Sequence, residues 1–175
     1  MKTILKTAML IAIMLSFSCD NESLSESSPD QEIASKSAHA KRVTKKITNS
    51  LASDPDPNAT NECGEALFYG IMSHMGQVTG YTYDTTCYFT EYGTLISTGS
   101  EVTIAANGDE MWSVGTIEVT FPTDGSTIAT IEGGSTIVGG TGRFEGATGW
   151  FVFENMVYDL ITFHESHTAY GEITY

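Results

Sequence analysis

The feature that most constrains the fold of this chain is a run of alternating side chains between residues 110 and 121. One face of an extended chain would carry Met111, Ser113, Gly115, Ile117, Val119 and Phe121. The residues between them include the polar or charged Glu110, Thr116 and Glu118. A period of two places alternate side chains on opposite faces of a strand. The run therefore predicts a β-strand with one face that is solvated or lines a lumen.

Turn signals divide the rest of the C-terminal region into further strands. Asn107–Gly108 predicts a tight hairpin turn, and Gly133–Gly134 predicts a bulge or bend. Extended runs are expected at 65–74, 77–83, 87–92, 101–106, 127–133, 136–138, 144–154, 157–163 and 168–175. We predict an all-β domain in which about eight short antiparallel strands close into a small barrel, because closure leaves no exposed sheet edge. An open β-sandwich is the alternative fold.

The N-terminal residues have the composition of an export signal. Lys2 and Lys6 precede an apolar run at 8–15, which is too short to span a bilayer as a stable helix. The run Ser16–Asp20 (Ser-Phe-Ser-Cys-Asp) resembles a bacterial lipoprotein lipobox. The resemblance implies cleavage before Cys19 and acylation of this residue, and several acyl chains give a stable membrane anchor. An ordinary signal peptide followed by an incidental cysteine is the alternative.

The segment after this cysteine has the composition of a tether. A Ser-rich stretch at 23–28 and the Pro-containing stretch 54–57 interrupt regular structure. Val43, Ile47 and Leu51 are four residues apart, which is the spacing of a short amphipathic helix. A solvated spacer is the other interpretation and the one we favour. The expected organisation is a signal peptide at 1–18, a lipid anchor and flexible tether at 19–60, and a barrel domain at 61–175.

A glycine-rich segment at 137–149 (IVGGTGRFEGATG) is the most distinctive motif of the barrel region. It resembles the hairpin of the allene oxide cyclase and dirigent barrel families, and the similarity covers roughly residues 64–175. The positions of the motif are Gly140, Gly142, Phe144, Gly146, Ala147 and Gly149. We expect Gly140 and Gly142 to allow positive φ in the turn, and Phe144 to cap one end of the barrel. The resemblance implies a lumen that binds a small molecule, but no catalytic residue is carried over, because a shared fold does not define an activity.

Two cysteines remain once Cys19 is assigned to lipidation. An exported chain is in an oxidising compartment, where a pair of cysteines forms a disulfide more often than a metal site or a reactive thiol. We expect a bridge between Cys63 and Cys87 that ties the start of the barrel to a later strand or loop. A reactive Cys87 is the alternative.

Charge is distributed unevenly along the chain. The formal net charge is −14, and the residues from 61 onward hold 15 of the 22 acids but one of the eight bases, Arg143. Nucleic acids and anionic membrane surfaces require clustered cations. We therefore expect no nucleic-acid partner and a preference against anionic ligands. Membrane contact is expected through the lipidated N-terminus, at the outer membrane or the periplasmic face of a bacterial envelope.

Aromatic and titratable residues supply the candidate ligand site. Aromatic side chains with polar tips suit the mouth of a small barrel, and core packing is their alternative role. Glu132 and Glu154 lie within apolar runs and are candidates for acid–base chemistry if they face a lumen. The tentative ligand-binding residues are Tyr69, His74, Tyr83, Trp112, Glu132 and Trp150, with Met72 and Tyr81 as further lining. For His74, a structural role in a turn is the favoured alternative.

The last histidines are close in sequence, since His164 and His167 flank Glu165. This spacing invites a metal site, but we favour exposed loop residues between the last two strands. No metal, cofactor or catalytic residue is therefore assigned. The favoured function is a non-catalytic binding module for a small apolar or aromatic ligand. The alternatives are a cyclase or isomerase that acts by confinement, and a structural or interaction lipoprotein with a solid barrel.

Overall fold

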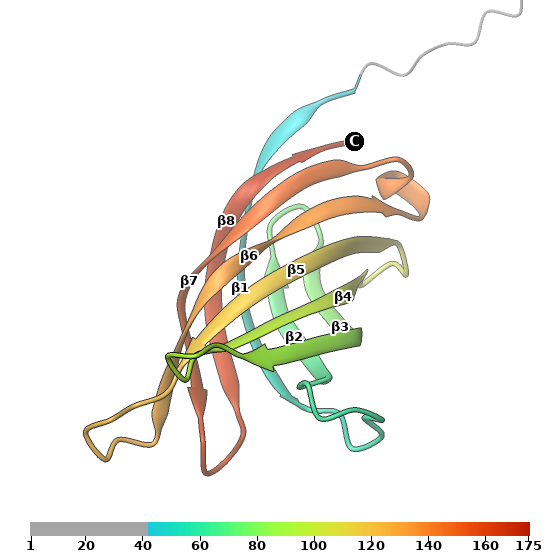
Figure 1. Cartoon of the computed structure of the whole chain (residues 1–175). Coiled ribbons are helices and arrows are strands. Elements are labelled where there is room, and N and C mark those ends of the chain that lie inside the picture. Colours follow the sequence, from blue (N-terminus) through green and yellow to red (C-terminus); the bar gives the residue numbers. More distant parts are fainter. Residues whose placement is uncertain (1–41) are drawn as a thin grey trace, which may run out of the picture. The chain divides into compact units, whose positions relative to one another are not determined.

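The computed structural model describes residues 42–175, which form a single antiparallel sheet closed into a barrel (Figure 1). The elements are β1 (Thr44–Pro55), β2 (Ala66–Met72), β3 (Gly76–Phe89), β4 (Leu95–Ala105), β5 (Glu110–Thr120), β6 (Ile128–Gly140), the 3-10 helix η1 (Gly142–Phe144), β7 (Thr148–Asp159) and β8 (Glu165–Thr174). Each strand pairs with the next one along the chain, and β8 pairs with β1. The prediction of an all-β barrel is confirmed, and the open sandwich is wrong. Within residues 42–175, no helix has the length and apolar character needed to cross a membrane.

The two ends of the barrel differ. The connections β2–β3, β4–β5 and β6–β7 lie at one end, which we call the closed end. Val43 immediately precedes β1 and Tyr175 immediately follows β8, so both residues lie at this end as well, and their backbones exchange hydrogen bonds. The opposite end, which we call the mouth, is surrounded by the connections at 56–65, 90–94, 121–127 and 160–164.

The first strand corrects the expected domain boundary. Residues 44–55, which the sequence assigns to the tether, form β1 and pair with both β2 and β8. Ile47 and Leu51 are buried, and the side chains of Asn49 and Ser53 share their inward face. Apolar residues four positions apart fit both a helix and a strand. Four residues are close to one helical turn, and they are also an even number, which places the side chains on one face of a strand. The part of the proposed tether at 19–41 lies outside the described residues.

Two of the expected turn features are present. Asn107 and Gly108 lie in the β4–β5 connection, and Gly108 has a φ of 87°. Gly133 and Gly134 lie within β6, where the register to β7 shifts. β3 is longer than expected, because it continues through an irregularity between Tyr83 and Thr86.

The closed end is filled by a hydrophobic cluster. Phe144 is fully buried in η1, and its ring meets that of Tyr175 edge to face with centroids 5.4 Å apart. Met75, Met111 and Ile173 belong to the same cluster. Phe144 thus lies at one end of the barrel, as the glycine-rich motif suggested.

The glycines of this motif act in two ways. Gly142 adopts a φ of 55°, which favours glycine. Gly140 has no positive φ, and it is required for a different reason: a Cβ atom there would strike the carbonyl oxygen of Glu110 and the side chain of Phe144. Close approach of the backbone therefore replaces the turn role that we expected for Gly140.

The β1–β2 connection is fastened to the mouth. A disulfide joins Cys63 in this connection to Cys87 on β3, with the Cα atoms 5.4 Å apart, so the predicted bridge is confirmed. Thr85 Oγ1 donates a hydrogen bond of 2.8 Å to Asn61 Oδ1. From β4, Ser97 Oγ donates one of 3.2 Å to the carbonyl oxygen of Cys63. The connection is therefore held against two strands of the barrel wall.

Candidate functional site

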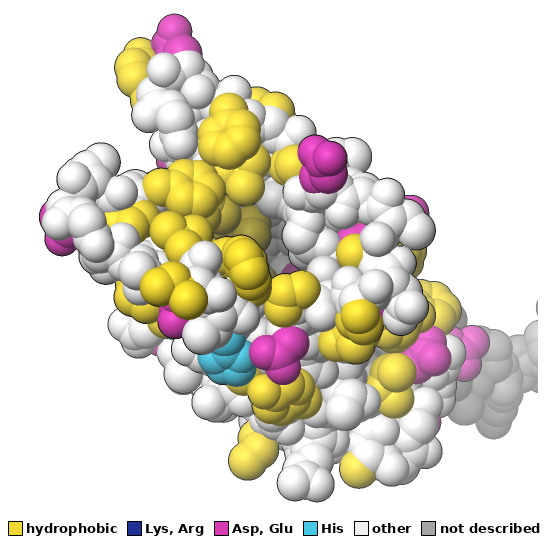
Figure 2. All heavy atoms as spheres, turned by 90° about the horizontal axis from the view of Figure 1, so that it is seen from below, with side chains coloured by type: hydrophobic (Ala, Val, Ile, Leu, Met, Phe, Trp, Pro, Cys, Tyr) yellow, Lys and Arg dark blue, Asp and Glu magenta, His cyan; other side chains and the backbone are white. Residues whose placement is uncertain are grey.

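The barrel lumen contains a cavity of about 100 Å³. It extends from Asn49 and Phe151 in the body of the barrel to Gly64 at the mouth. Figure 2 looks at the barrel from below and shows hydrophobic side chains around a hollow. The apolar part of the wall consists of Leu51, Phe68, Met72, Ile117, Phe151, Phe153 and Met156. An engineered apolar cavity of ~150 Å³ binds benzene. This lumen is smaller but extends to the mouth, so the ligand it suits is no larger than one small ring.

Glu101 is the first titratable group of the lumen. It lies on the inward face of β4 with Ser97, Gly99 and Thr103, and all four residues line the cavity. Glu101 keeps some accessible surface because it lines the cavity, although its carboxyl group is removed from bulk water. Burial consequently raises the pKa of Glu101 above its ordinary value, although hydrogen bonds and the charge of His167 oppose the shift.

Hydroxyl groups from the neighbouring strands hold the Glu101 carboxyl group. Ser113 Oγ on β5 lies 2.6 Å from Oε2, and Ser135 Oγ on β6 lies 3.1 Å from the same oxygen. Gly115 leaves room for this arrangement, since a Cβ atom there would lie 2.6 Å from Ser135 Oγ and 3.1 Å from Glu101 Oε1. Small residues on β5 and β6 therefore make the space and the partners for one buried carboxyl group.

A second polar group comes from the start of β8. His167 Nδ1 lies 3.0 Å from Glu165 Oε1, and the two side chains are 8% and 17% exposed. The Phe153 ring packs against the imidazole in a T-shaped arrangement with centroids 5.0 Å apart. A carboxylate accepts hydrogen bonds, so this contact assigns the proton of the neutral imidazole to Nδ1 and leaves a lone pair on Nε2.

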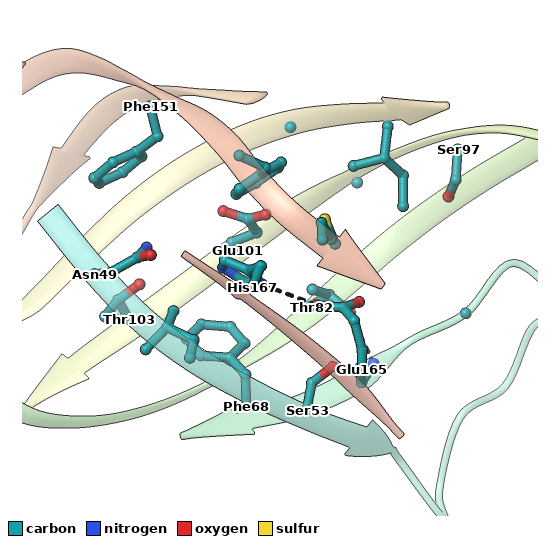
Figure 3. Close-up of a pocket in the computed structure, with 18 of the residues that line it drawn as sticks. Asn49, Ser53, Phe68, Thr82, Ser97, Glu101, Thr103, Phe151, Glu165 and His167 are labelled. Carbon is teal, nitrogen blue, oxygen red and sulfur yellow. Dashed lines mark hydrogen bonds and ion pairs between the residues drawn. The ribbon is translucent and has the colours of Figure 1, made fainter. Parts of the chain in front are cut away.

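Two buried polar atoms of the cavity wall lack a hydrogen-bond partner within residues 42–175. They are His167 Nε2 and Asn49 Oδ1. Figure 3 shows Asn49, Glu101 and His167 projecting into the same lumen from three different strands. Leaving such atoms unpaired costs about 1–3 kcal/mol each. A ligand with polar groups would therefore recover free energy here.

The chemical character of the lumen follows from its titratable groups. Among the residues that line the cavity, Glu101, Glu165 and His167 are the ones that can carry charge, and none is Lys or Arg. In the described part of the chain, no three His, Cys, Asp or Glu residues are grouped so that they could hold a metal ion. The arrangement can bind an uncharged polar group, and it can donate and accept protons.

None of the six tentative ligand residues lines this cavity. Trp112 and Trp150 lie on the outer surface and are 38% and 41% exposed. Tyr69, Tyr83, Glu132 and, outside that set, Glu154 are exposed as well. His74 lies in the β2–β3 turn, and its Nε2 atom is 2.9 Å from the carbonyl oxygen of Lys46. This contact fits the alternative role that we favoured for His74, a structural role in a turn. Met72, named as further lining, does reach the lumen.

Strand parity explains these differences. On β5 the inward residues are the odd-numbered ones, such as Met111 and Ser113, so Trp112 points outward. On β4 the inward residues that follow Leu95 are polar or small, and the apolar Ile96 and Ile104 face the other way. The Tyr and Trp residues were therefore a poor guide to the lumen, whose aromatic lining is Phe68, Phe151 and Phe153.

The three titratable lumen residues were not among the predicted ligand residues. Glu165 and His167 were assigned to a loop because the last strand was expected to begin at residue 168, whereas β8 begins at Glu165. The odd-numbered inward series of β8 continues through Ala169 and Ile173. Extending this alternation backwards from Ala169 by two steps of two residues would have placed His167 and Glu165 on the same inward face.

We compared the chain with known protein families, with curated proteins and with solved structures, and none of the three comparisons found a significant match. The similarity of segment 137–149 to the allene oxide cyclase and dirigent hairpin stays a prediction. The functional argument therefore depends on the geometry of the lumen.

Proposed function

We propose that the protein is a binding module whose barrel lumen takes up one small, uncharged apolar or aromatic molecule with a polar group. The observation that carries the proposal is the cavity of about 100 Å³, in which an apolar wall surrounds two polar atoms that have no partner among residues 42–175. Ligand sites commonly combine an apolar lining with a few oriented polar groups. A solid structural barrel is less well supported, because its lumen would be filled by side chains.

Charge favours an uncharged ligand. The residues from 61 onward carry 15 acids and one base, and two of those acids, Glu101 and Glu165, line the cavity. Bringing an anion into this lumen would require desolvation without a fixed cation to offset it. The lumen should therefore select phenol-like or ketone-like molecules over carboxylates of the same size.

Binding can be tested with three probes of similar size: phenol, toluene and benzoate. Titration calorimetry and NMR chemical shifts should detect binding of phenol, weaker binding of toluene, and none of benzoate. The variant Met156→Trp places a larger side chain in the cavity wall and should abolish phenol binding. Val152→Trp on the outer face of the same strand is the matched control and should bind phenol normally. Absence of phenol and toluene binding by the folded wild-type protein would contradict the proposal.

We further propose that this module is held at a bacterial envelope membrane by acylation of Cys19, which lies outside the described residues. Support comes from the lipobox-like run Ser16–Asp20 and from the position of the first residues of β1, which lie at the closed end of the barrel and not at the mouth. The mass of the protein from the membrane fraction should include the acyl groups. Cys19→Ser should release the protein from that fraction, and an unmodified Cys19 in the wild-type protein would contradict the anchor.

A further inference from the structure

The unpaired Nε2 atom of His167 carries an inference beyond binding. This nitrogen is buried in the cavity wall, while Nδ1 of the same ring is occupied by Glu165. Glu101 lines the same cavity from β4. The lumen thus contains the components of an acid–base site. These are the free ring nitrogen of His167, the Glu165 carboxylate on the other side of that ring, and the Glu101 carboxyl group.

We propose that the lumen catalyses proton exchange at the α-carbon of a small uncharged carbonyl compound, with His167 as the base and Glu101 as the acid. This inference rests on the proposed binding of a small molecule in the lumen. It adds a reaction, and it narrows the ligand to molecules with a carbonyl oxygen and an adjacent C–H group.

The step balances without any further reactant. The Nε2 lone pair takes the α-proton, the C–H bonding pair becomes a C=C bond, and the carbonyl π pair moves to oxygen. That oxygen takes the acidic proton of Glu101, whose O–H bond breaks. The products are an enol, a protonated His167 beside the Glu165 carboxylate, and a Glu101 carboxylate. Return of protons in the reverse direction regenerates the ketone, after exchange of the abstracted proton with solvent.

The surroundings of Glu101 and His167 fit their roles as acid and base. Glu101 is held by Ser113 and Ser135 away from bulk water, where the protonated acid is favoured. Glu165 is a positioning residue, because its carboxylate orients the ring through Nδ1 and offsets the charge formed on it.

The probe for the test is cyclohexanone, an uncharged ring of suitable size with exchangeable α-hydrogens. Its uptake of deuterium in D2O at neutral pH is followed by NMR with the wild-type protein and with protein-free buffer. We expect protein-dependent exchange that falls about 100-fold in His167→Gln and in Glu101→Gln, within the usual range for general acid–base groups. Glu154→Gln, which changes an exposed residue of β7, should exchange at the wild-type rate.

A positioning role for Glu165 has its own signature. In Glu165→Ala the exchange should fall about 10-fold, and ¹⁵N NMR should show His167 changing from the Nδ1–H to the Nε2–H tautomer. Loss of exchange with an unchanged tautomer would contradict the positioning role. The ¹H–¹⁵N spectrum and the urea midpoint of each variant establish that the barrel is folded.

Saturation-transfer NMR separates the two proposals. If cyclohexanone binds to wild type and to His167→Gln but the wild-type protein causes no exchange above buffer, the acid–base inference is overturned and the binding function stands. If folded wild type binds neither cyclohexanone nor phenol, both proposals fail. If exchange is equal in wild type and His167→Gln, the base has been misassigned and the inference is also overturned.

Discussion

Ser113 Oγ lies 2.6 Å from Glu101 Oε2, so a hydroxyl group on β5 fixes a carboxyl group that β4 directs into the lumen. The two residues are direct neighbours across the strand pair. Hydroxyl groups can donate to a carboxylate or accept from a protonated acid. Ser113 can therefore bind Glu101 in either protonation state.

The stability of the barrel should fall as pH rises because of Glu101. Burial raises the pKa of this group above 4.5, so the folded protein binds the proton more tightly than the unfolded chain does. The stabilising contribution is complete below pH 4.5 and is lost as pH rises through the folded-state pKa. Urea unfolding between pH 4 and 8 should show this decline in wild type and a smaller one in Glu101→Gln. Glu118→Gln, on the outer face of β5, should retain it; identical pH profiles for wild type and Glu101→Gln would refute the assignment.

The disulfide should stabilise the barrel by restricting the unfolded chain. Replacing both Cys63 and Cys87 by Ser should lower the free energy of unfolding by ~2–4 kcal/mol. Urea unfolding of the wild-type protein with a reductant should reproduce this loss. The reductant should have no effect on the double variant, and an effect there would show that it acts elsewhere.

Phe144 should be the more costly of two phenylalanines to remove. It is 0% exposed at the closed end, whereas Phe163 in the β7–β8 connection is 52% exposed. Phe144→Ala should cost ~3–5 kcal/mol because it leaves a cavity. Phe163→Ala should change stability by less than about 0.5 kcal/mol. Similar unfolding midpoints for the two variants would contradict the packing described for η1.

Residues 44–55 should be required for folding. A chain that begins at residue 42 contains β1 and should unfold cooperatively, with a dispersed NMR spectrum. A chain that begins at residue 61 lacks β1, so β2 and β8 become exposed sheet edges and the buried side chains of Ile47 and Leu51 are missing. This shorter chain should aggregate or remain unfolded. A cooperative transition in it would mean that seven strands suffice.

The barrel was predictable because its strongest signals are local. The alternation of 110–121 and the turn at Asn107–Gly108 need no tertiary information, and both are present in the structure. β1 was missed because two of its four inward residues, Asn49 and Ser53, are polar. An alternating apolar pattern cannot reveal a strand that faces a partly polar lumen.

The site was harder to predict than the barrel, because the inward faces of its strands are partly polar. Glu101 was not among the candidate residues, because nothing local shows that Ser113 and Ser135 on two other strands enclose its carboxyl group. The large aromatic side chains at Trp112 and Trp150 suggested a lining, yet both lie on the outside. Sequence alternation identified the two faces of the strands but did not show which face was inward.

Closure of the barrel depends on the two strands that are farthest apart in the chain. β1 begins with Thr44, which is paired with Thr174 at the end of β8. The hairpins between them involve near neighbours in sequence, whereas this pairing requires a long-range contact, which forms slowly. The last β-ladder therefore cannot form before residues 165–174 have been synthesised. Until then β1 keeps one edge without a strand partner, so the sheet stays open along its whole length and no enclosed lumen exists.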